Sequence, residues 1–171
     1  MIFQDPQSSL NPRLTIATIL TEPMAVHGIG ESRADRLERA AAYMEMVGLD
    51  PAMLNRYPTE FSGGQRQRIG IARAVALEPR FIVCDEVASA LDVSVQAKIL
   101  QLLDELKREL NLTYLFITHN IDVVRYFADD IEVMYQGRLV ETGEAVEVCD
   151  RPTREYTQKL LSAVPKFAYQ R

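Results

Sequence analysis

A turn of small residues that opens a helix, Ser62-Gly63-Gly64-Gln65, has the composition of an anion site. Glycine lets the backbone approach a ligand closely, and Ser62 can cap the helix while it offers a hydroxyl group. The free N–H groups at the helix start and the positive end of the helix dipole then point at one place, which suits a phosphate. Taken alone, the same residues fit an ordinary capped helix better than a ligand site, because such turns are common.

Two adjacent carboxylates, Asp85 and Glu86, end the apolar run Phe81-Ile82-Val83-Cys84. This run has the length and composition of a buried strand, and Pro79 separates it from the helical stretch before it. Neighbouring residues at the tip of a strand can point in different directions, so one carboxylate can face a metal ion and the other a water molecule. By itself, such an acid pair is also typical of the start of a helix.

The order of these motifs resembles that of the ATPase subunits of ATP-binding cassette (ABC) transporters. The glycine turn looks like the family's signature motif, and the apolar run with its carboxylates looks like the Walker B strand. Three more segments resemble the Q-loop, the D-loop and the H-loop: Met1-Ile2-Phe3-Gln4-Asp5-Pro6, Ser89-Ala90-Leu91-Asp92 and Thr118-His119. Further segments are similar to the subfamily that imports oligopeptides, dipeptides, nickel or glutathione: Tyr57-Pro58, Asp92-Val93-Ser94-Val95-Gln96, Pro152-Thr153 and Tyr156-Thr157.

The resemblance implies ATP and Mg²⁺ as cofactors and gives each motif residue a role. Glu86 would be the catalytic base that polarises the attacking water, and Asp85 would hold the metal, usually through water. His119 would bind the terminal phosphate, while His27 has no motif around it. Gln4 would reach the metal and the attacking water. Only three residues precede Gln4, so we expect the strand that should anchor it to be nearly absent.

In the family, ATP is held between the Walker A loop of one subunit and the signature motif of another. Ser62, Gly63, Gly64 and Gln65 would therefore bind a nucleotide held by a partner, and Asp92 would approach the site of that same partner. The implied partners are a second ABC ATPase subunit, identical or different, and transmembrane permease subunits. The implied location is the cytoplasm, peripheral at the inner face of the cell membrane.

No Gly-x-x-x-x-Gly-Lys-Ser/Thr sequence occurs in the 171 residues, so no Walker A loop can cradle the phosphates of the chain's own nucleotide. We expect the C-terminal part of an ATP hydrolase coupled to transport, inactive as an isolated chain. The alternatives are an inert gene remnant and an interaction module that docks on an ABC transporter. ATPase heads of chromosome-maintenance proteins also carry a signature helix, but long heptad arms are absent here.

Composition excludes several other classes of protein. The net charge is -5, with basic and acidic residues well mixed, so no basic stripe indicates a nucleic-acid partner. The longest apolar runs are well short of the roughly 20 residues that a membrane-spanning helix needs. Cys84 and Cys149 lack the spacing of a metal site, and we expect both to be structural.

The predicted fold class is α/β, a partial P-loop NTPase-like ABC ATPase fold spanning residues 1–171. A helical subdomain with the signature motif is expected at about 5–78, and part of the parallel-sheet core, with a C-terminal hairpin and helix, at about 79–171. Continuous apolar runs linked by amphipathic helices predict a sheet covered on both faces. The expected elements are a helix around Leu37–Val47 closed by Gly48, strands at Phe81–Cys84 and Tyr114–Ile117, a core helix at Val95–Leu110, a hairpin at Ile131–Val140 turning at Gln136-Gly137, and a helix at Glu155–Ala163.

Overall fold

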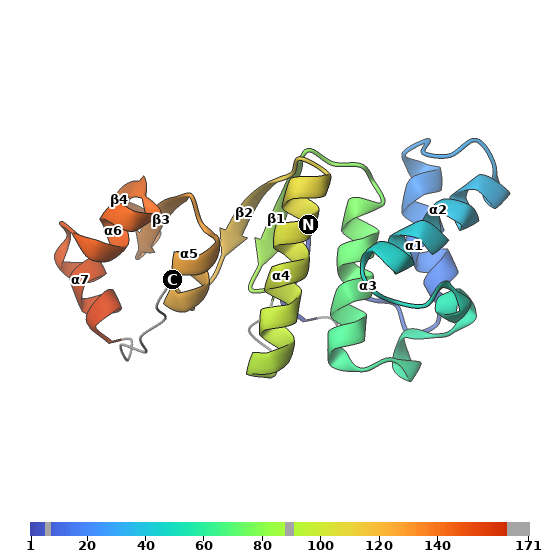
Figure 1. The fold of residues 1–171 in the computed structure, drawn as a ribbon, viewed down its shortest axis with the longest axis horizontal. Helices are drawn as coiled ribbons and strands as arrows, with labels where there is room; N and C mark the ends of the chain where they lie inside the picture. The colour runs from blue at the N-terminus through green and yellow to red at the C-terminus, as the bar shows by residue number, and fades with distance from the viewer. Residues whose placement is uncertain (6–7, 88–90, 164–171) are drawn as a thin grey trace. The chain divides into compact units, whose positions relative to one another are not determined.

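The computed structural model describes residues 1–5, 8–87 and 91–163. The chain divides into two compact units, Met1–Ile117 and Thr118–Arg171, called here the first and the second unit. Figure 1 shows their helices and strands. Both units combine helices with strands, as the predicted α/β class requires.

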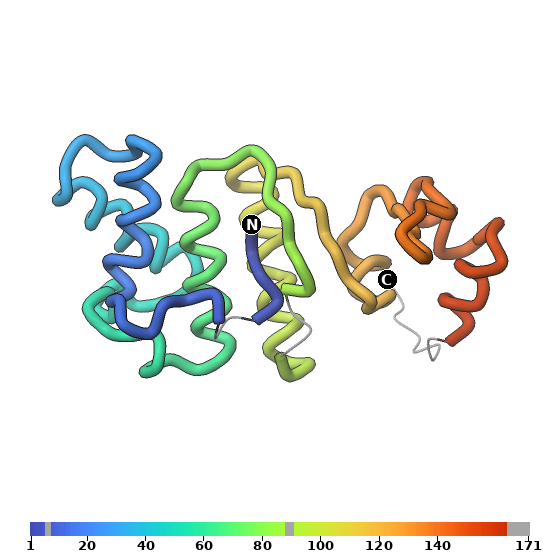
Figure 2. The backbone as a smooth tube through the Cα atoms, turned by 180° about the vertical axis from the view of Figure 1, so that it is seen from behind, coloured from blue at the N-terminus to red at the C-terminus, as the bar shows by residue number. Residues whose placement is uncertain are grey.

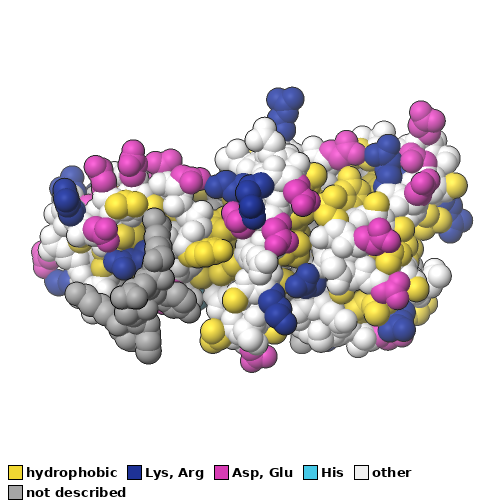
Figure 3. Space-filling model, in the orientation of Figure 1, with side chains coloured by type: hydrophobic (Ala, Val, Ile, Leu, Met, Phe, Trp, Pro, Cys, Tyr) yellow, Lys and Arg dark blue, Asp and Glu magenta, His cyan; other side chains and the backbone are white. Residues whose placement is uncertain are grey.

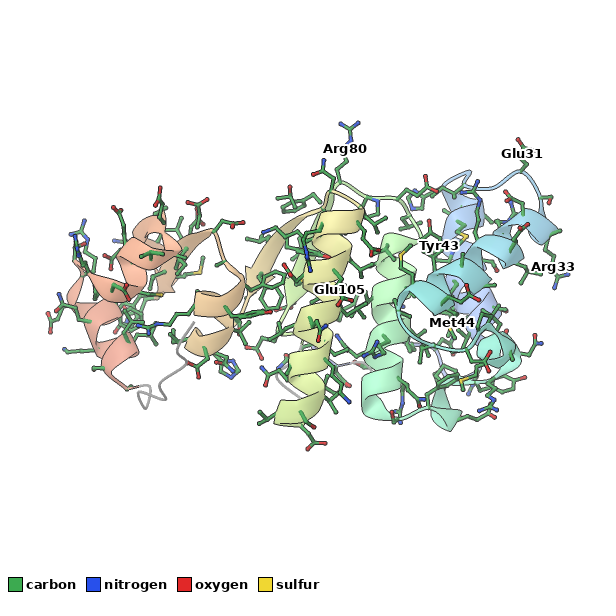
Figure 4. All side chains as sticks on the ribbon, in the orientation of Figure 1. Glu31, Arg33, Tyr43, Met44, Arg80 and Glu105 are labelled. Carbon is green, nitrogen blue, oxygen red and sulfur yellow. The ribbon has the colours of Figure 1, made fainter. Side chains whose placement is uncertain are left out.

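The helices of the first unit begin where the sequence offers polar caps. They are α1 (Ile16–Val26), α2 (Arg33–Met46) and α3 (Gly63–Val75), with the short 3₁₀-helices η1 (Pro51–Asn55) and η2 (Pro58–Glu60) before α3. Thr15, Ser32 and Ser62 each accept an N–H of the first turn with their side chains. Met44 of α2 is fully buried, whereas the side chains of Glu31 and Arg33 project outward (Figure 4).

A small parallel sheet completes the first unit. Strands β1 (Phe81–Asp85) and β2 (Thr113–Ile117) pair in parallel, with Val83 opposite Leu115, and α4 (Val93–Glu109) connects them. On the other side of β1, Ile2 forms a parallel bridge to Cys84, and Figure 2 shows the N-terminal segment beside this strand. The predicted parallel pairing and the core helix are confirmed: Ile99, Leu103 and Leu106 of α4 are buried.

One face of this sheet is not covered. Phe81, Leu115 and Ile117 are 54%, 47% and 46% exposed, while Ile82 and Cys84, which alternate with them along β1, are buried. Hydrophobic side chains reach the surface among the charged ones in Figure 3. The prediction of a sheet covered on both faces is therefore wrong for the described part of the first unit, because its helices bury only one set of alternating side chains.

The second unit is built around an antiparallel hairpin. Strands β3 (Asp130–Tyr135) and β4 (Arg138–Glu144) pair through the predicted turn at Gln136-Gly137, where both residues have positive φ, as a two-residue hairpin requires. Helices α5 (Ile121–Phe127), α6 (Ala145–Asp150) and α7 (Glu155–Ser162) accompany it. The inner face of the hairpin packs on α6 through Ile131, Val133, Val148 and Cys149.

No helix in the described ranges is both long and apolar enough to cross a membrane. Both cysteines are free and buried. Burial raises the pKa of the Cys84 thiol to about 12, so the thiolate required for nucleophilic or metal chemistry is disfavoured.

Candidate functional site

Gln4 and Glu86, 82 positions apart, are in direct contact in the first unit. The Gln4 side-chain amide donates a hydrogen bond from Nε2 to Oε2 of Glu86 at 2.7 Å. The segment before Gln4 is fixed to β1, because Ile2 N–H donates to Val83 O at 2.8 Å and Asp85 N–H donates to Ile2 O at 3.0 Å. As expected, the strand before Gln4 is nearly absent, since Ile2 forms only an isolated bridge, but this one residue makes both hydrogen bonds to β1.

The backbone at Glu86 turns sharply out of β1. Its φ is +47°, in the left-handed region, and its N–H donates to Ile117 O at the end of β2 at 2.9 Å. A residue with a Cβ pays about 1–2 kcal/mol for this conformation. The tertiary contacts around Glu86 sustain that cost and place its half-buried carboxylate beside Asp85, also half-buried, at the carboxyl end of the sheet. Glutamate is not typical of left-handed positions, so no sequence signal indicated this turn.

Asp85, Glu86 and Gln4 could bind Mg²⁺ only together with the phosphate oxygens of a nucleotide. Among the residues that the structure describes, no group of three or more His, Cys, Asp or Glu could hold a metal ion. Asp85, Glu86 and Gln4 nevertheless supply two carboxylates and an amide at one sheet edge. Magnesium is usually bound by one or two carboxylates together with water and phosphate oxygens, which fits this set.

The signature turn forms a reciprocal cap at the start of α3. Ser62 Oγ accepts the Gln65 N–H at 3.3 Å, and Gln65 Oε1 accepts the Ser62 N–H at 2.9 Å. Ser62 is the predicted N-cap and is exposed to solvent. The N–H groups of Gly63 and Gly64 fall in the first turn, where a helix provides no partner for them. The turn therefore presents backbone donors, a hydroxyl group and the positive end of a 13-residue helix.

Gly63 and Gly64 lie close to the residues that follow β1. A Cβ on Gly64 would stand 2.7 Å from Cγ1 of Val95 in α4, and one on Gly63 would stand 3.7 Å from Cδ2 of Leu91. Asp92 is the N-cap residue of α4 and is exposed. The fold therefore brings the signature turn and the end of the D-loop motif together, while Ser89 and Ala90 lie outside the described residues.

The two histidines belong to different units. His119 is exposed and belongs to the second unit, just before α5, whose N-cap Asn120 donates its backbone N–H to Thr118 Oγ1 at 3.0 Å. His27 follows α1 and lines a groove of about 350 Å³ with Ser9 and Arg73. The structure thus groups Gln4, Asp85 and Glu86 in the first unit.

Comparison with known proteins identifies the class. Residues 1–89 match the family described as ABC transporter, so half of the chain carries its profile, and the chain belongs to that family. Relatives from Bacillus subtilis (strain 168) and Escherichia coli (strain K12), both "Oligopeptide transport ATP-binding protein OppF", are each 53% identical over 165 residues. A "Putative peptide import ATP-binding protein" of Brucella ovis is 54% identical over 164 residues. These alignments cover 96% of this chain, but 54%, 49% and 51% of the relatives, so the chain spans about half their length.

Solved structures agree on the fold. The chain matches cbiO1 from Clostridium perfringens, part of the ABC transporter complex cbiONQ, with a TM-score of 0.76 and 27% identity over 96% of this chain and 63% of that one. It also matches the ATP-binding cassette MJ0796, a dimer bound to ADP and Pi, with a TM-score of 0.71 and 33% identity over 84% and 62% of the two chains. The expected partial ABC ATPase fold is confirmed.

Proposed function

We propose that this chain is the signature-bearing part of an ATP-binding subunit in an ABC importer for oligopeptides. The observation that carries the proposal is the exposed Ser62 turn, where the N–H groups of Gly63 and Gly64 fall in the first turn of α3 and have no partner within the helix. Such a turn suits the terminal phosphate of a nucleotide held by another subunit. Asp92 approaches the same nucleotide, since its neighbours Leu91 and Val95 lie beside the glycines.

Gln4, Asp85 and Glu86 serve a different nucleotide, the one belonging to the chain's own side of the dimer. Glu86 orients and polarises the attacking water, and Asp85 with Gln4 holds the magnesium ion, which neutralises charge on the phosphates. His119 adds a hydrogen bond to the terminal phosphate. Because the 171 residues contain no Walker A sequence, the chain alone binds Mg-ATP weakly and does not turn it over. A dissociation constant in the low micromolar range, measured by calorimetric titration of the isolated chain, would contradict this.

Oligopeptides are the proposed solute because the relatives named above carry oligopeptide or peptide transport in their names. Other subunits of an importer mainly select the solute. The residues of this chain therefore contribute to the ATP hydrolysis that drives transport and not to the choice of solute. Its partners are a second ATPase subunit, identical or different, and transmembrane permease subunits, which hold it at the inner face of the cell membrane.

The test is rescue in trans. The chain is mixed with a relative that has an intact Walker A loop but a disabled signature serine, and ATP hydrolysis is measured. We expect partial rescue, because the start of α3 contributes only about 0.3–1 kcal/mol per exposed charge contact, and up to about 2 kcal/mol when partly buried. Ser62→Arg should abolish rescue through steric and charge conflict at the phosphate. Glu86→Gln should leave it intact, because the base acting on that nucleotide is the partner's own.

Absence of rescue at every mixing ratio, although the two chains associate, would refute the trans-acting role. The chain would then be better described as an interaction module or an inert remnant. If Glu86→Gln also abolished rescue, Glu86 would be acting on the partner's nucleotide. The assignment of Glu86 to the chain's own nucleotide would then be wrong.

A further inference from the structure

Arg73 links α3 to the segment that follows Gln4. Its Nη1 donates to Ser9 O at 2.6 Å, joining residues 64 positions apart. The guanidinium is half-buried, and this burial lowers its pKa from the usual value, although it remains charged. Hydrogen bonds from charged donors are among the stronger ones in proteins. Releasing Ser9 would leave a partly desolvated charge poorly compensated, so the contact fixes the loop on α3.

The path from Ser9 back to Glu86 is short. Ser9 N–H donates to Asp5 O at 3.2 Å, and Asp5 is the residue after Gln4 in the chain. Gln4 then donates to Glu86 at 2.7 Å. On its other side Gln4 is held by Ile2, which makes two hydrogen bonds to β1. Gln4 therefore lies between one fixed point on the sheet and another on α3.

We propose that Arg73 is a positioning residue: by holding Ser9 on α3 it keeps Gln4 against Glu86. Coupling of this kind passes through rigid elements joined by hydrogen bonds. The consequence for hydrolysis rests on the proposed function, because a carboxylate oxygen occupied by Gln4 is less available to the attacking water.

The test follows the side-chain amide signal of Gln4 by ¹⁵N NMR in the full chain, assigned with Gln4→Leu. Glu86→Ala defines the signal position of the released amide. Arg73→Met removes the guanidinium but keeps the apolar stem, and we expect it to shift the Gln4 signal toward the Glu86→Ala position. Arg73→Lys keeps a charged donor able to reach Ser9, and it should restore the wild-type position.

Arg68→Met is the matched control. Arg68 is also a half-buried arginine of α3 whose Nη1 donates at 2.6 Å to a backbone carbonyl, but that carbonyl belongs to Val47 at the end of α2. It should leave the Gln4 signal unchanged. An unshifted signal in Arg73→Met overturns the proposal, and so does an equal shift in Arg68→Met.

Thermal unfolding of each variant distinguishes a local release from loss of the fold. If Arg73→Met does not fold, Arg73→Gln replaces it, because glutamine is polar but too short to reach Ser9. The Gln4 amide signal is then compared with that of the same control, Arg68→Met. The NMR experiment measures the position of Gln4 and not ATP hydrolysis. Its failure can therefore be told apart from failure of the rescue experiment, which measures ATP hydrolysis and depends on Ser62.

Discussion

At the scale of single residues, Glu86 combines a proposed chemical role with a demanding backbone conformation. Its φ of +47° predicts that Glu86→Gly is more stable than Glu86→Ala by about 1 kcal/mol, because alanine retains the Cβ that disfavours the left-handed region. Urea unfolding of both variants measures the difference. Asp85, which is the last residue of β1, is the control, and there alanine should be the more stable of the two. The same order at both positions would contradict the turn described at Glu86.

At the scale of elements, two of the three glycines of α3, Gly64 and Gly70, have opposite surroundings. A Cβ on Gly64 would meet Cγ1 of Val95 at 2.7 Å, whereas nothing lies within 4 Å of one on Gly70. We expect Gly64→Ala to destabilise the first unit by about 1–3 kcal/mol, because β-branched Val95 has little freedom to move away. Gly70→Ala should stabilise it by up to about 1 kcal/mol through helix propensity. Denaturant unfolding checks both, and a stable Gly64→Ala variant would refute the close packing of α3 on α4.

In the second unit, Glu141 of β4 anchors the start of α7. The Thr157 hydroxyl and the Thr153 N–H, followed by the Thr153 hydroxyl, lower its pKa to about 2 from an ordinary value near 4.5. Since the folded-state pKa is the lower one, the ionised carboxylate stabilises the unit fully above about pH 4.5, and this contribution is lost as the pH falls toward 2. Glu141→Gln should remove that part of the pH dependence.

The Glu141 prediction is checked by thermal unfolding between pH 7 and pH 2, with Glu132→Gln on β3 as the control for removing one carboxylate from the same hairpin. Identical pH profiles for Glu141→Gln and the wild type would contradict the role of Glu141 at α7. The anchor also gives a structural account of the segments around Thr153 and Thr157: Glu141 accepts the Thr153 N–H at 2.7 Å and the Thr153 hydroxyl at 2.9 Å, while Thr157 is buried.

At the scale of the whole molecule, the uncovered face of the β1–β2 sheet predicts association. Parallel sheets are normally buried on both faces, and exposed apolar surface of this kind favours contacts between chains. Sedimentation should therefore show concentration-dependent association, reduced by Leu115→Glu. Leu139→Glu is the matched control, because Leu139 of β4 is 53% exposed, compared with 47% for Leu115, but lies in the second unit. A sharp monomeric boundary for the wild type, with cooperative unfolding, would contradict the prediction.

Local features could be predicted from the sequence because their causes are local. The Ser62 cap depends on residues three positions apart, the Gln136-Gly137 turn on two adjacent residues, and α4 on apolar residues recurring at helical spacing. The same signals placed the strand that ends in Asp85 to within one residue. They also supported the family resemblance, since its motifs are short segments read in order along the chain.

Only the tertiary structure decided which distant residues meet. The contact of Gln4 with Glu86, the bridge from Ile2 to Cys84 and the hydrogen bond from Arg73 to Ser9 join residues 64–82 positions apart, and no periodicity encodes such pairings. The uncovered sheet face was likewise mispredicted, because an apolar run shows that a strand can be buried but not which elements are present to bury it. Sequence patterns determine where helices and strands form and which of their faces are apolar. The closure of long loops and the packing of side chains determine which distant residues meet in the site.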